Sequence, residues 1–226
     1  MDLQVEKRFS RGYSFGMAYT LSDCTDNTAE HLATGGSPSR SQNARALEGW
    51  RGPCGYDTRH RFAGNFVAEL PFAKNSSGAA KLLLANWQLS GIYAARSGRP
   101  FTVTQGSNNV GPYHNGLPNQ TGSGEGPQTV DKWFDPTQFP AVTSGTFGNA
   151  KRNALRGPSW QGLDLSLQKR FAPTRANLTL RWDVFNVLNT VNLGLPNADI
   201  SSATVGTISS LSGDARLMQF SLRVTF

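Results

Sequence analysis

Apolar and polar residues alternate one by one along several segments of this chain of 226 residues. The C-terminal stretch RLMQFSLRVTF shows the pattern most clearly, because every second residue from Met218 to Phe226 is apolar and those between are polar. Successive side chains of a β-strand point to opposite faces, so such a segment forms a strand with one apolar and one polar face. Segments of this kind lie near residues 2–9, 13–22, 59–72, 82–104, 160–171, 176–188 and 216–226. The sequence therefore predicts an all-β protein.

The connections between these segments alternate strictly between short and long. Short links with turn residues lie at 10–12, 73–81 and 172–175, whereas long links span about 23–58, 105–159 and 189–215. Compact soluble domains rarely contain structureless loops beyond about 15 residues. Outer-membrane barrels, in contrast, combine short periplasmic turns with long extracellular loops. We therefore predict an antiparallel up-and-down meander of about seven strands that forms a partial transmembrane β-barrel, with three long extracellular loops and short periplasmic turns.

The two faces of the predicted strands differ in a way that suits a membrane barrel. The apolar face would contact lipid, and the polar face, with Arg61, Arg96 and Asp183 among its residues, would line the lumen. We expect aromatic residues near the strand ends to form interfacial belts. They are Phe9, Tyr13, Phe72, Trp87, Trp160, Phe171 and Phe226. Two alternatives remain open: a soluble β-sandwich that binds a ligand, or a complete small outer-membrane barrel closed by another strand within residues 105–159.

Several other classes of protein do not fit the sequence. No apolar run approaches the roughly 18 residues of a transmembrane helix, and Met1 is not followed by the basic and apolar regions of a signal peptide. The net charge of +7 would suit an acidic partner, but the basic residues are scattered and no nucleic-acid-binding motif is present. We expect neither a transmembrane helix nor a nucleic-acid partner.

The chain lacks the residue patterns of catalytic and metal sites. His31, His60 and His114 are far apart and have no Cys or His partners at the spacing of metal ligands. The acidic residues within 23–30 lack the glycine and the full ligand set of a calcium loop. No serine lies in a Gly-x-Ser-x-Gly element followed by His and Asp. The sequence therefore predicts no enzyme activity, no metal and no cofactor.

The long loops contain cysteines and aromatic residues. Cys24 and Cys54 are the only cysteines, and both lie in the first long loop. In an oxidising compartment they would form a disulfide worth roughly 3–4 kcal/mol; two free thiols in a cytosolic chain are the alternative. The loop aromatics could offer a platform to a ligand or pack the loops together, and we favour packing. They are Trp50, Tyr56, Tyr113, Trp133, Phe134 and Phe139.

Longer stretches carry more specific motifs. They are DTRHRFAGNFVAELPF (57–72), WQLSGIYAARSGRPFTV (87–103), WFDPTQFPAV (133–142), GTFGNAKRNALRGPSWQGLDLSLQKRF (145–171) and LRWDVFNVLNTVN (180–192). Together they resemble the C-terminal barrel of a TonB-dependent receptor of the Oar-like subgroup, which has a carboxypeptidase-regulatory-like N-terminal domain. The matching residues include Gly148, Asn149, Arg152, Asn153, Leu155, Arg156, Gly157, Pro158, Asp164, Leu165, Lys169, Phe185, Asn186 and Asn189.

The final strand resembles the C-terminal signature that the barrel-assembly machinery recognises in bacterial outer-membrane proteins. It places Met218, Phe220, Leu222, Val224 and Phe226 on one face and ends on an aromatic residue. A strand with an unpaired edge can be captured by addition to another sheet. We therefore expect the barrel-assembly machinery to be a partner of this strand.

The resemblance implies a transporter in the bacterial cell outer membrane that takes up a bulky ligand through a plugged barrel of about 22 strands. It implies contacts with outer-membrane lipid and lipopolysaccharide, with the remaining strands and the plug, and with TonB only through the N-terminal part. Residues 1–226 then correspond to the C-terminal portion, without plug, TonB box or signal peptide, and we expect a truncated reading frame or a fragment. Since open sheet edges leave backbone groups unpaired in a bilayer, the isolated chain should aggregate or need detergent.

Overall fold

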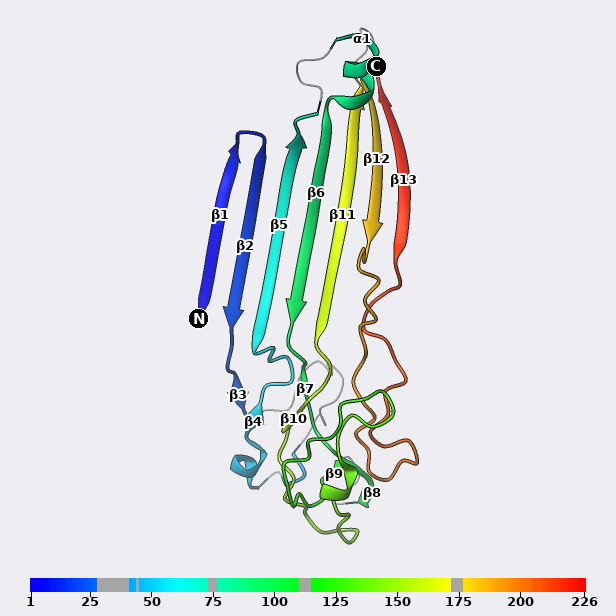
Figure 1. Ribbon diagram of the computed structural model, residues 1–226. Helices are drawn as coiled ribbons and strands as arrows, with labels where there is room; N and C mark the ends of the chain where they lie inside the picture. The colour runs from blue at the N-terminus through cyan, green and yellow to red at the C-terminus, as the bar shows by residue number, and fades with distance from the viewer. Residues whose placement is uncertain (28–40, 44, 73–76, 110–114, 172–176) are drawn as a thin grey trace.

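Seven long strands form one sheet in the computed structural model, which describes residues 1–27, 41–43, 45–72, 77–109, 115–171 and 177–226 (Figure 1). The strands are β1 (Asp2–Ser10), β2 (Tyr13–Leu21), β5 (His60–Leu70), β6 (Trp87–Arg96), β11 (Trp160–Phe171), β12 (Asn177–Phe185) and β13 (Leu217–Thr225). They follow one another in sequence order, and each is antiparallel to its neighbours. The predicted all-β antiparallel meander is confirmed.

Short and long connections lie at opposite ends of this sheet (Figure 1). The tightest turn joins β1 to β2 through Arg11 and Gly12, whose φ angles of 55° and 88° are those of a type I′ hairpin turn. The C-terminus lies at the same end as this turn, and the three long connections gather beyond the other end (Figure 1). The predicted asymmetry between the two ends is therefore present in the structure.

The predicted strand at 82–104 is wrong at its beginning. Residues Gly78–Leu84 form helix α1, because their run of alanine, lysine and leucine favours a helix and does not alternate. Strand β6 consequently starts only at Trp87. The connection from β5 to β6 is therefore longer than expected, and residues 73–76 of its predicted turn lie outside the described residues.

The same prediction is also wrong at its end, since β6 stops at Arg96. The chain then passes Gly98, where any Cβ atom would overlap the carbonyl of Gly157. Beyond it, β7 (Pro100–Phe101) pairs with β10 (Leu155–Arg156) in a separate small sheet. The second long loop therefore starts earlier than predicted and folds back on itself.

One face of the large sheet is mostly apolar from β2 to β13, and Lys7 of β1 continues it at the edge. A single row across the strands contains Phe15, Phe66, Gly91, Leu165, Val184 and Met218. Trp182 stacks on Phe220 of the adjacent strand, with ring centroids 5.6 Å apart. Within the described part of the chain, no second sheet packs on this face, and Phe220 is 69 % exposed. The structure therefore does not support the soluble β-sandwich, which would bury these side chains.

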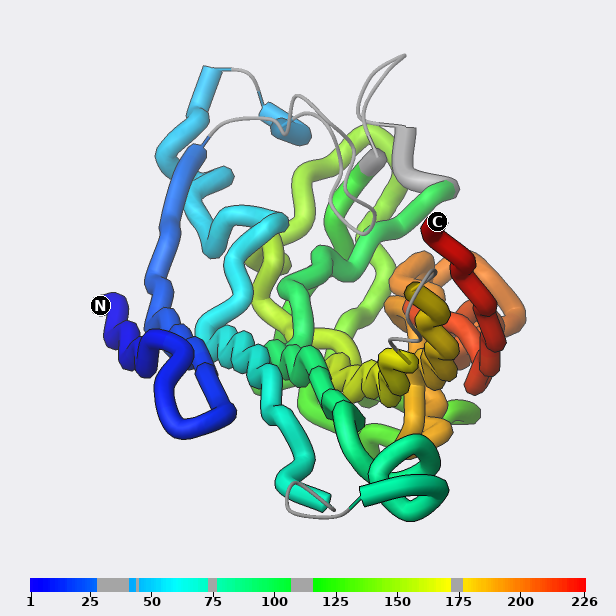
Figure 2. The backbone as a smooth tube through the Cα atoms, turned by 90° about the horizontal axis from the view of Figure 1, so that it is seen from above, coloured from blue at the N-terminus to red at the C-terminus, as the bar shows by residue number. Residues whose placement is uncertain are grey.

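The sheet is curved, and its two sides carry different structures. In Figure 2, which looks along the strands, the long loops project to one side of the arc and α1 lies on the other. The indole Nε1 of Trp87 donates a hydrogen bond of 3.1 Å to the Leu83 carbonyl, which places the end of α1 on the apolar side. Lys169 lies on this side as well, yet it is only 1 % exposed, and its Nζ donates a hydrogen bond to the Ala85 carbonyl.

Most of the predicted interfacial aromatics lie at the short-connection end of the sheet. Phe9 and Tyr13 flank the first turn, and the others at this end are Phe72, Trp87, Phe171 and Phe226. Trp160 is an exception, because it begins β11 at the loop end and shares the polar face with Asp164. Its assignment to a lipid-facing belt is therefore wrong, whereas a belt role for the other six stays a prediction.

The long loops have a hydrophobic core of their own. Short elements organise them: β3 (Thr25–Asp26), η1 (Leu47–Trp50), β4 (Gly52–Pro53), β8 (Gln105–Asn109), β9 (Asn115–Gly116) and η2 (Pro136–Gln138). Their buried side chains form one cluster of Trp50, Phe101, Val103, Leu117, Phe134, Phe139, Ala150 and Leu155. The described residues of the loops thus fold together, and we call them the loop region (the described residues within 22–59, 97–159 and 186–216).

Candidate functional site at the loop end of the sheet

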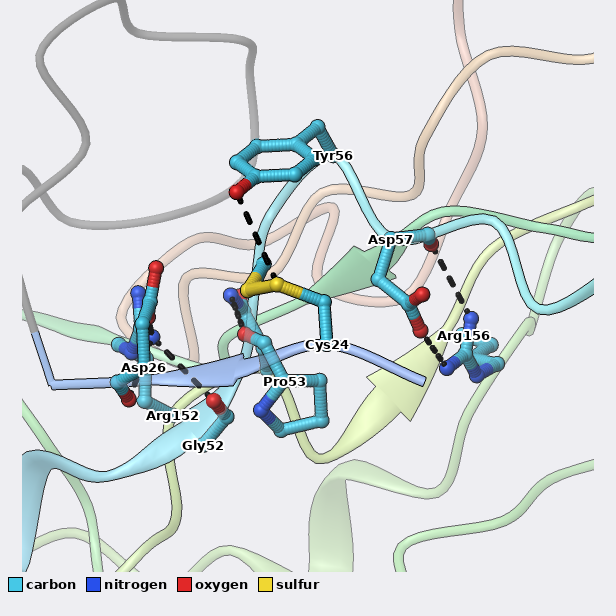
Figure 3. Close-up of a disulfide and its surroundings, with 10 residues drawn as sticks. Cys24, Asp26, Gly52, Pro53, Tyr56, Asp57, Arg152 and Arg156 are labelled. Carbon is cyan, nitrogen blue, oxygen red and sulfur yellow. Dashed lines mark hydrogen bonds and ion pairs between the residues drawn. A yellow bond between two sulfur atoms is a disulfide. The ribbon is translucent and has the colours of Figure 1, made fainter. Parts of the chain in front are cut away.

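The first long loop is closed by a disulfide next to a short β-ladder. Cys24 and Cys54 are bonded through their sulfur atoms, with Cα atoms 5.5 Å apart (Figure 3). Beside them, β3 pairs with β4, and the backbone N–H of Cys54 donates to the Cys24 carbonyl at 3.0 Å. The predicted pairing is the one in the structure, and the disulfide brings the two ends of this loop together beyond the loop-side ends of β2 and β5.

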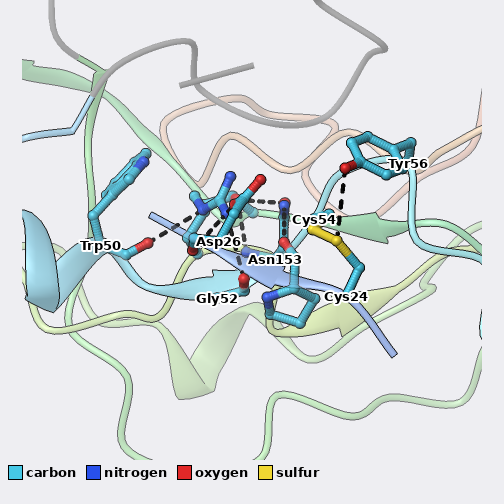
Figure 4. A network of polar contacts seen from close by, with 10 residues as sticks. Cys24, Asp26, Trp50, Gly52, Cys54, Tyr56 and Asn153 are labelled. Atoms are coloured by element: carbon cyan, nitrogen blue, oxygen red, sulfur yellow. Dashed lines mark hydrogen bonds and ion pairs between the residues drawn. A yellow bond between two sulfur atoms is a disulfide. The ribbon is translucent and has the colours of Figure 1, made fainter. Parts of the chain in front are cut away.

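Arg152 of the second long loop is buried against the first. Its guanidinium donates hydrogen bonds to the carbonyls of Trp50 at 3.2 Å, Asp26 at 3.1 Å and Gly52 at 3.4 Å, and it forms an ion pair with the Asp26 carboxylate (Figure 4). The side chain of Arg152 is fully buried. Burial lowers the pKa of Arg152, although a guanidinium still remains charged at neutral pH. One arginine thus links the two loops through several contacts.

The residues after Arg152 extend this link. The Asn153 side-chain amide donates to the Pro53 carbonyl at 2.7 Å, and its backbone N–H donates to the hydroxyl of Thr102 at 2.9 Å. Arg156 donates to the Asp57 carboxylate at 2.6 Å (Figure 3). The stretch RNALRG (152–157) therefore holds the first two loops together.

The third long loop is tied at its base by the Phe-Asn-x-x-Asn motif. Asn186 directly follows β12 with a φ of 49°, and its backbone N–H donates to the Asp164 carboxylate at 2.8 Å. The Asn186 amide donates to the carbonyls of Thr190 at 3.1 Å and Asp214 at 2.9 Å. This single side chain therefore joins the beginning and the end of the third loop.

Most of the loop aromatics pack the loops together, as we favoured. Trp50, Phe134 and Phe139 are buried in the loop core, so they are unavailable as a ligand platform. Trp133 is partly buried, and its indole Nε1 donates to the Arg156 carbonyl at 2.8 Å. Tyr56 is 64 % exposed, with its hydroxyl 3.7 Å from Cys24 Sγ. Tyr113 lies outside the described residues.

Asp135 orders the turn that carries these aromatics. It precedes the short helix η2, and its carboxylate accepts hydrogen bonds from the Thr137 backbone N–H and the Gln138 amide. Lys132 lies 3.1 Å away and forms an ion pair with it. The hydrogen bonds from Lys132, Gln138 and Thr137 lower the pKa of Asp135 to about 2. The Asp of the Trp-Phe-Asp-Pro motif is therefore ionised whenever the loop region is folded near neutral pH.

A recess opens where the polar face of the sheet meets the loop region. Its volume is about 650 Å³, and its lining includes Tyr56, Arg61, Arg96, Arg99, Trp160 and Ser212. The guanidinium carbon of Arg96 lies 5.5 Å from the centroid of the Trp160 ring. The sequence placed Arg61 and Arg96 on the polar face but could not bring them together, because that requires the strand register. We regard this recess as the candidate binding site.

The described residues contain no group of three or more His, Cys, Asp and Glu side chains that could hold a metal ion. His60 lies with its Nδ1 2.8 Å from the Tyr19 hydroxyl, and Asp23 forms an ion pair with Arg59 at 3.3 Å. His31, His114 and Glu30 lie outside the described residues.

Among the described helices, none is long and apolar enough to cross a membrane.

A one-layered antiparallel sheet with an apolar outer face, a charged opposite face and long loops at one end is the architecture of an outer-membrane β-barrel. The chain belongs to the outer membrane beta barrel domain family, whose model matches residues 1–219. The protein is thus located in the bacterial outer membrane. No curated protein and no solved structure matches the chain.

Proposed function

We propose that this chain is the C-terminal barrel portion of a TonB-dependent receptor that takes up a bulky ligand. The observation that carries the proposal is the open sheet of seven strands, in which β1 and β13 form the two opposite edges (Figure 1). Every backbone N–H and C=O group inside a bilayer needs a partner, so both edges require further strands. The remaining strands of a larger receptor barrel would supply them.

The structure also fits the other parts of such a receptor. The polar face would line the interior, and the loop region has the compact form of a surface that could hold a ligand at the entrance. The exposed apolar face, which includes Phe220 and Leu222, would contact acyl chains, and the loop end would lie among lipopolysaccharide. The plug and TonB would act through the N-terminal part of the receptor.

An uptake experiment in the bacterium that carries the gene tests this function. Mass spectrometry of the medium is expected to find a bulky compound that is depleted by wild-type cells and by a complemented deletion strain. Depletion should stop in the deletion strain, and also in wild-type cells treated with a protonophore, because TonB-driven transport needs the energised inner membrane. Depletion that depends on the gene but continues with the protonophore would instead indicate a passive barrel.

We also propose that β13 is captured by the barrel-assembly machinery. Phe226 is fully exposed at the short-connection end, and β13 has one unpaired edge on which strand addition can occur. Deleting Phe226 is expected to lower the amount of heat-modifiable protein in the outer membrane several-fold, as measured by semi-native electrophoresis of membrane fractions. The control is Thr225→Ala, which changes the other face of β13. Equal amounts of assembled protein for the deletion and the control would contradict the proposal.

A further inference from the structure

We propose that the recess between the sheet and the loop region binds a soluble ligand group with two or more negative charges, such as a phosphorylated or polycarboxylate group. The inference refines the proposed uptake by naming a ligand class. Binding to the recess nevertheless does not require transport, so the two proposals can fail separately.

The strand register brings like charges together at this point. Arg61 of β5 and Arg96 of β6 are direct cross-strand partners on the polar face, and Trp160 of β11 follows in the same row. Like charges directly opposite one another destabilise a sheet. The positive charge of Arg99, just after β6, also acts on Arg96. Three guanidinium groups therefore converge on one recess at a cost to stability.

The described residues provide no acidic partner for these three arginines. The ion pairs of the described chain involve Arg59, Lys132, Arg152, Arg156 and Arg181. Arg59, two residues before Arg61, pairs with Asp23, so carboxylates are present close to this end of the sheet. The side chain of Arg99 in addition holds a buried Nε without a hydrogen-bond acceptor. A bound anion would supply the missing negative charge.

The shape and chemistry of the recess narrow the class of ligand. Guanidinium groups match phosphate and carboxylate oxygens in paired hydrogen bonds, and three of them suit a group with more than one negative charge. The volume of about 650 Å³ lies within the range of small-molecule sites. Trp160 and Tyr56 add aromatic surface beside the charges. A compact anionic group attached to a larger body would fit this arrangement.

The position of the recess favours a soluble anion over the phosphates of lipopolysaccharide. Arg61, Arg96 and Trp160 lie on the polar face of the sheet, whereas the lipid would contact the apolar face. Tyr56 and Ser212 bring the first and third loops to the same recess. A ligand that enters from outside between the loops would meet these side chains before it reached the interior of the barrel.

Calorimetric titration of the full chain, extracted in zwitterionic detergent, tests the inference with inorganic pyrophosphate and citrate as probes. We expect saturable binding of at least one probe, weakened by added salt. Arg61→Gln and Arg96→Gln should each weaken it by about tenfold or more, since each removes charge-assisted hydrogen bonds. The control Arg223→Gln, which changes the polar face of β13 far from the recess, should bind as the wild type does.

Thermal unfolding of the same variants separates a binding role from a structural one. Without the probe, Arg61→Gln should unfold at the same temperature as the wild type or a higher one, because a like-charge pair is removed. The inference is overturned by a lack of saturable binding, by an Arg223→Gln variant as weak as Arg61→Gln, or by a lower unfolding temperature of Arg61→Gln. Displacement of pyrophosphate by lipopolysaccharide at equal phosphate concentration would assign the recess to lipid headgroups instead and refute a soluble ligand.

Discussion

Replacing Arg152 with methionine is expected to open the loop region while the seven-stranded sheet stays folded. The substitution keeps much of the side-chain volume but leaves the carbonyls of Trp50 and Gly52 without their donor and the Asp26 carboxylate without its ion pair. Removing one partner of a buried ion pair costs about 3–5 kcal/mol. At about 1.4 kcal/mol per factor of ten, the opening equilibrium of the loop region should rise by roughly two to three and a half orders of magnitude.

Hydrogen–deuterium exchange of the full chain in detergent measures this effect. Protection should fall in residues 98–103 and 150–158, whereas the strands of the large sheet should keep theirs, because they do not contact Arg152. Lys151→Met is the matched control, since the neighbouring Lys151 is exposed and should tolerate the change. Unchanged protection of the loops in Arg152→Met, or equal loss of protection in the strands, would show that Arg152 does not have this role.

Removing the disulfide should have the second-largest effect. In the loop-entropy model, a bond between Cys24 and Cys54, which are separated by 30 residues, stabilises the folded state by about 3–4 kcal/mol. The variant with both Cys24→Ser and Cys54→Ser should therefore show faster proteolytic cleavage within the first long loop. Reducing the wild-type protein should produce the same change, which provides an independent control for the substitutions themselves.

Intact mass decides first whether the bond is present. Protein extracted from the outer membrane should gain the mass of one hydrogen atom per sulfur on reduction, because that compartment is oxidising. If the mass does not change, the cysteines are free in the cell. If the bond is present but the double variant resists proteolysis as well as the wild type does, the loop region does not depend on it.

The large sheet could be predicted because the signal for each strand, the alternation of apolar and polar residues, lies within the strand itself. A strand with one lipid-facing side must alternate, so the pattern from Tyr13 to Leu21 or from Met218 to Phe226 reveals both the strand and its faces. The order of the strands followed from the lengths of the connections. The helix α1 was missed because its leucine run was joined to the alternating residues after Trp87.

The candidate site could be predicted only in part. The motif around Arg152 and Asn153 was visible as a resemblance, but its role depends on carbonyls of Trp50 and Pro53 about a hundred residues away. Arg61 and Arg96 lie side by side only because of the register in which β5 pairs with β6, and the sequence does not reveal that register. The loop core was equally hidden, since Phe101 was assigned to the end of a predicted strand and Phe134 lies in a segment without a regular period.

The buried lysine on the apolar side of the sheet has a consequence for how the protein sits in its bilayer. Lys169 shares a row with Leu180 and Leu222, but its ammonium is held by the Ala85 carbonyl at the short-connection end. Moving the strands outward would carry this cation, together with the Ala85 carbonyl, into hydrocarbon. We therefore expect Lys169 to oppose a shift of the strands toward the cell exterior and so to help set the depth of the sheet in the membrane.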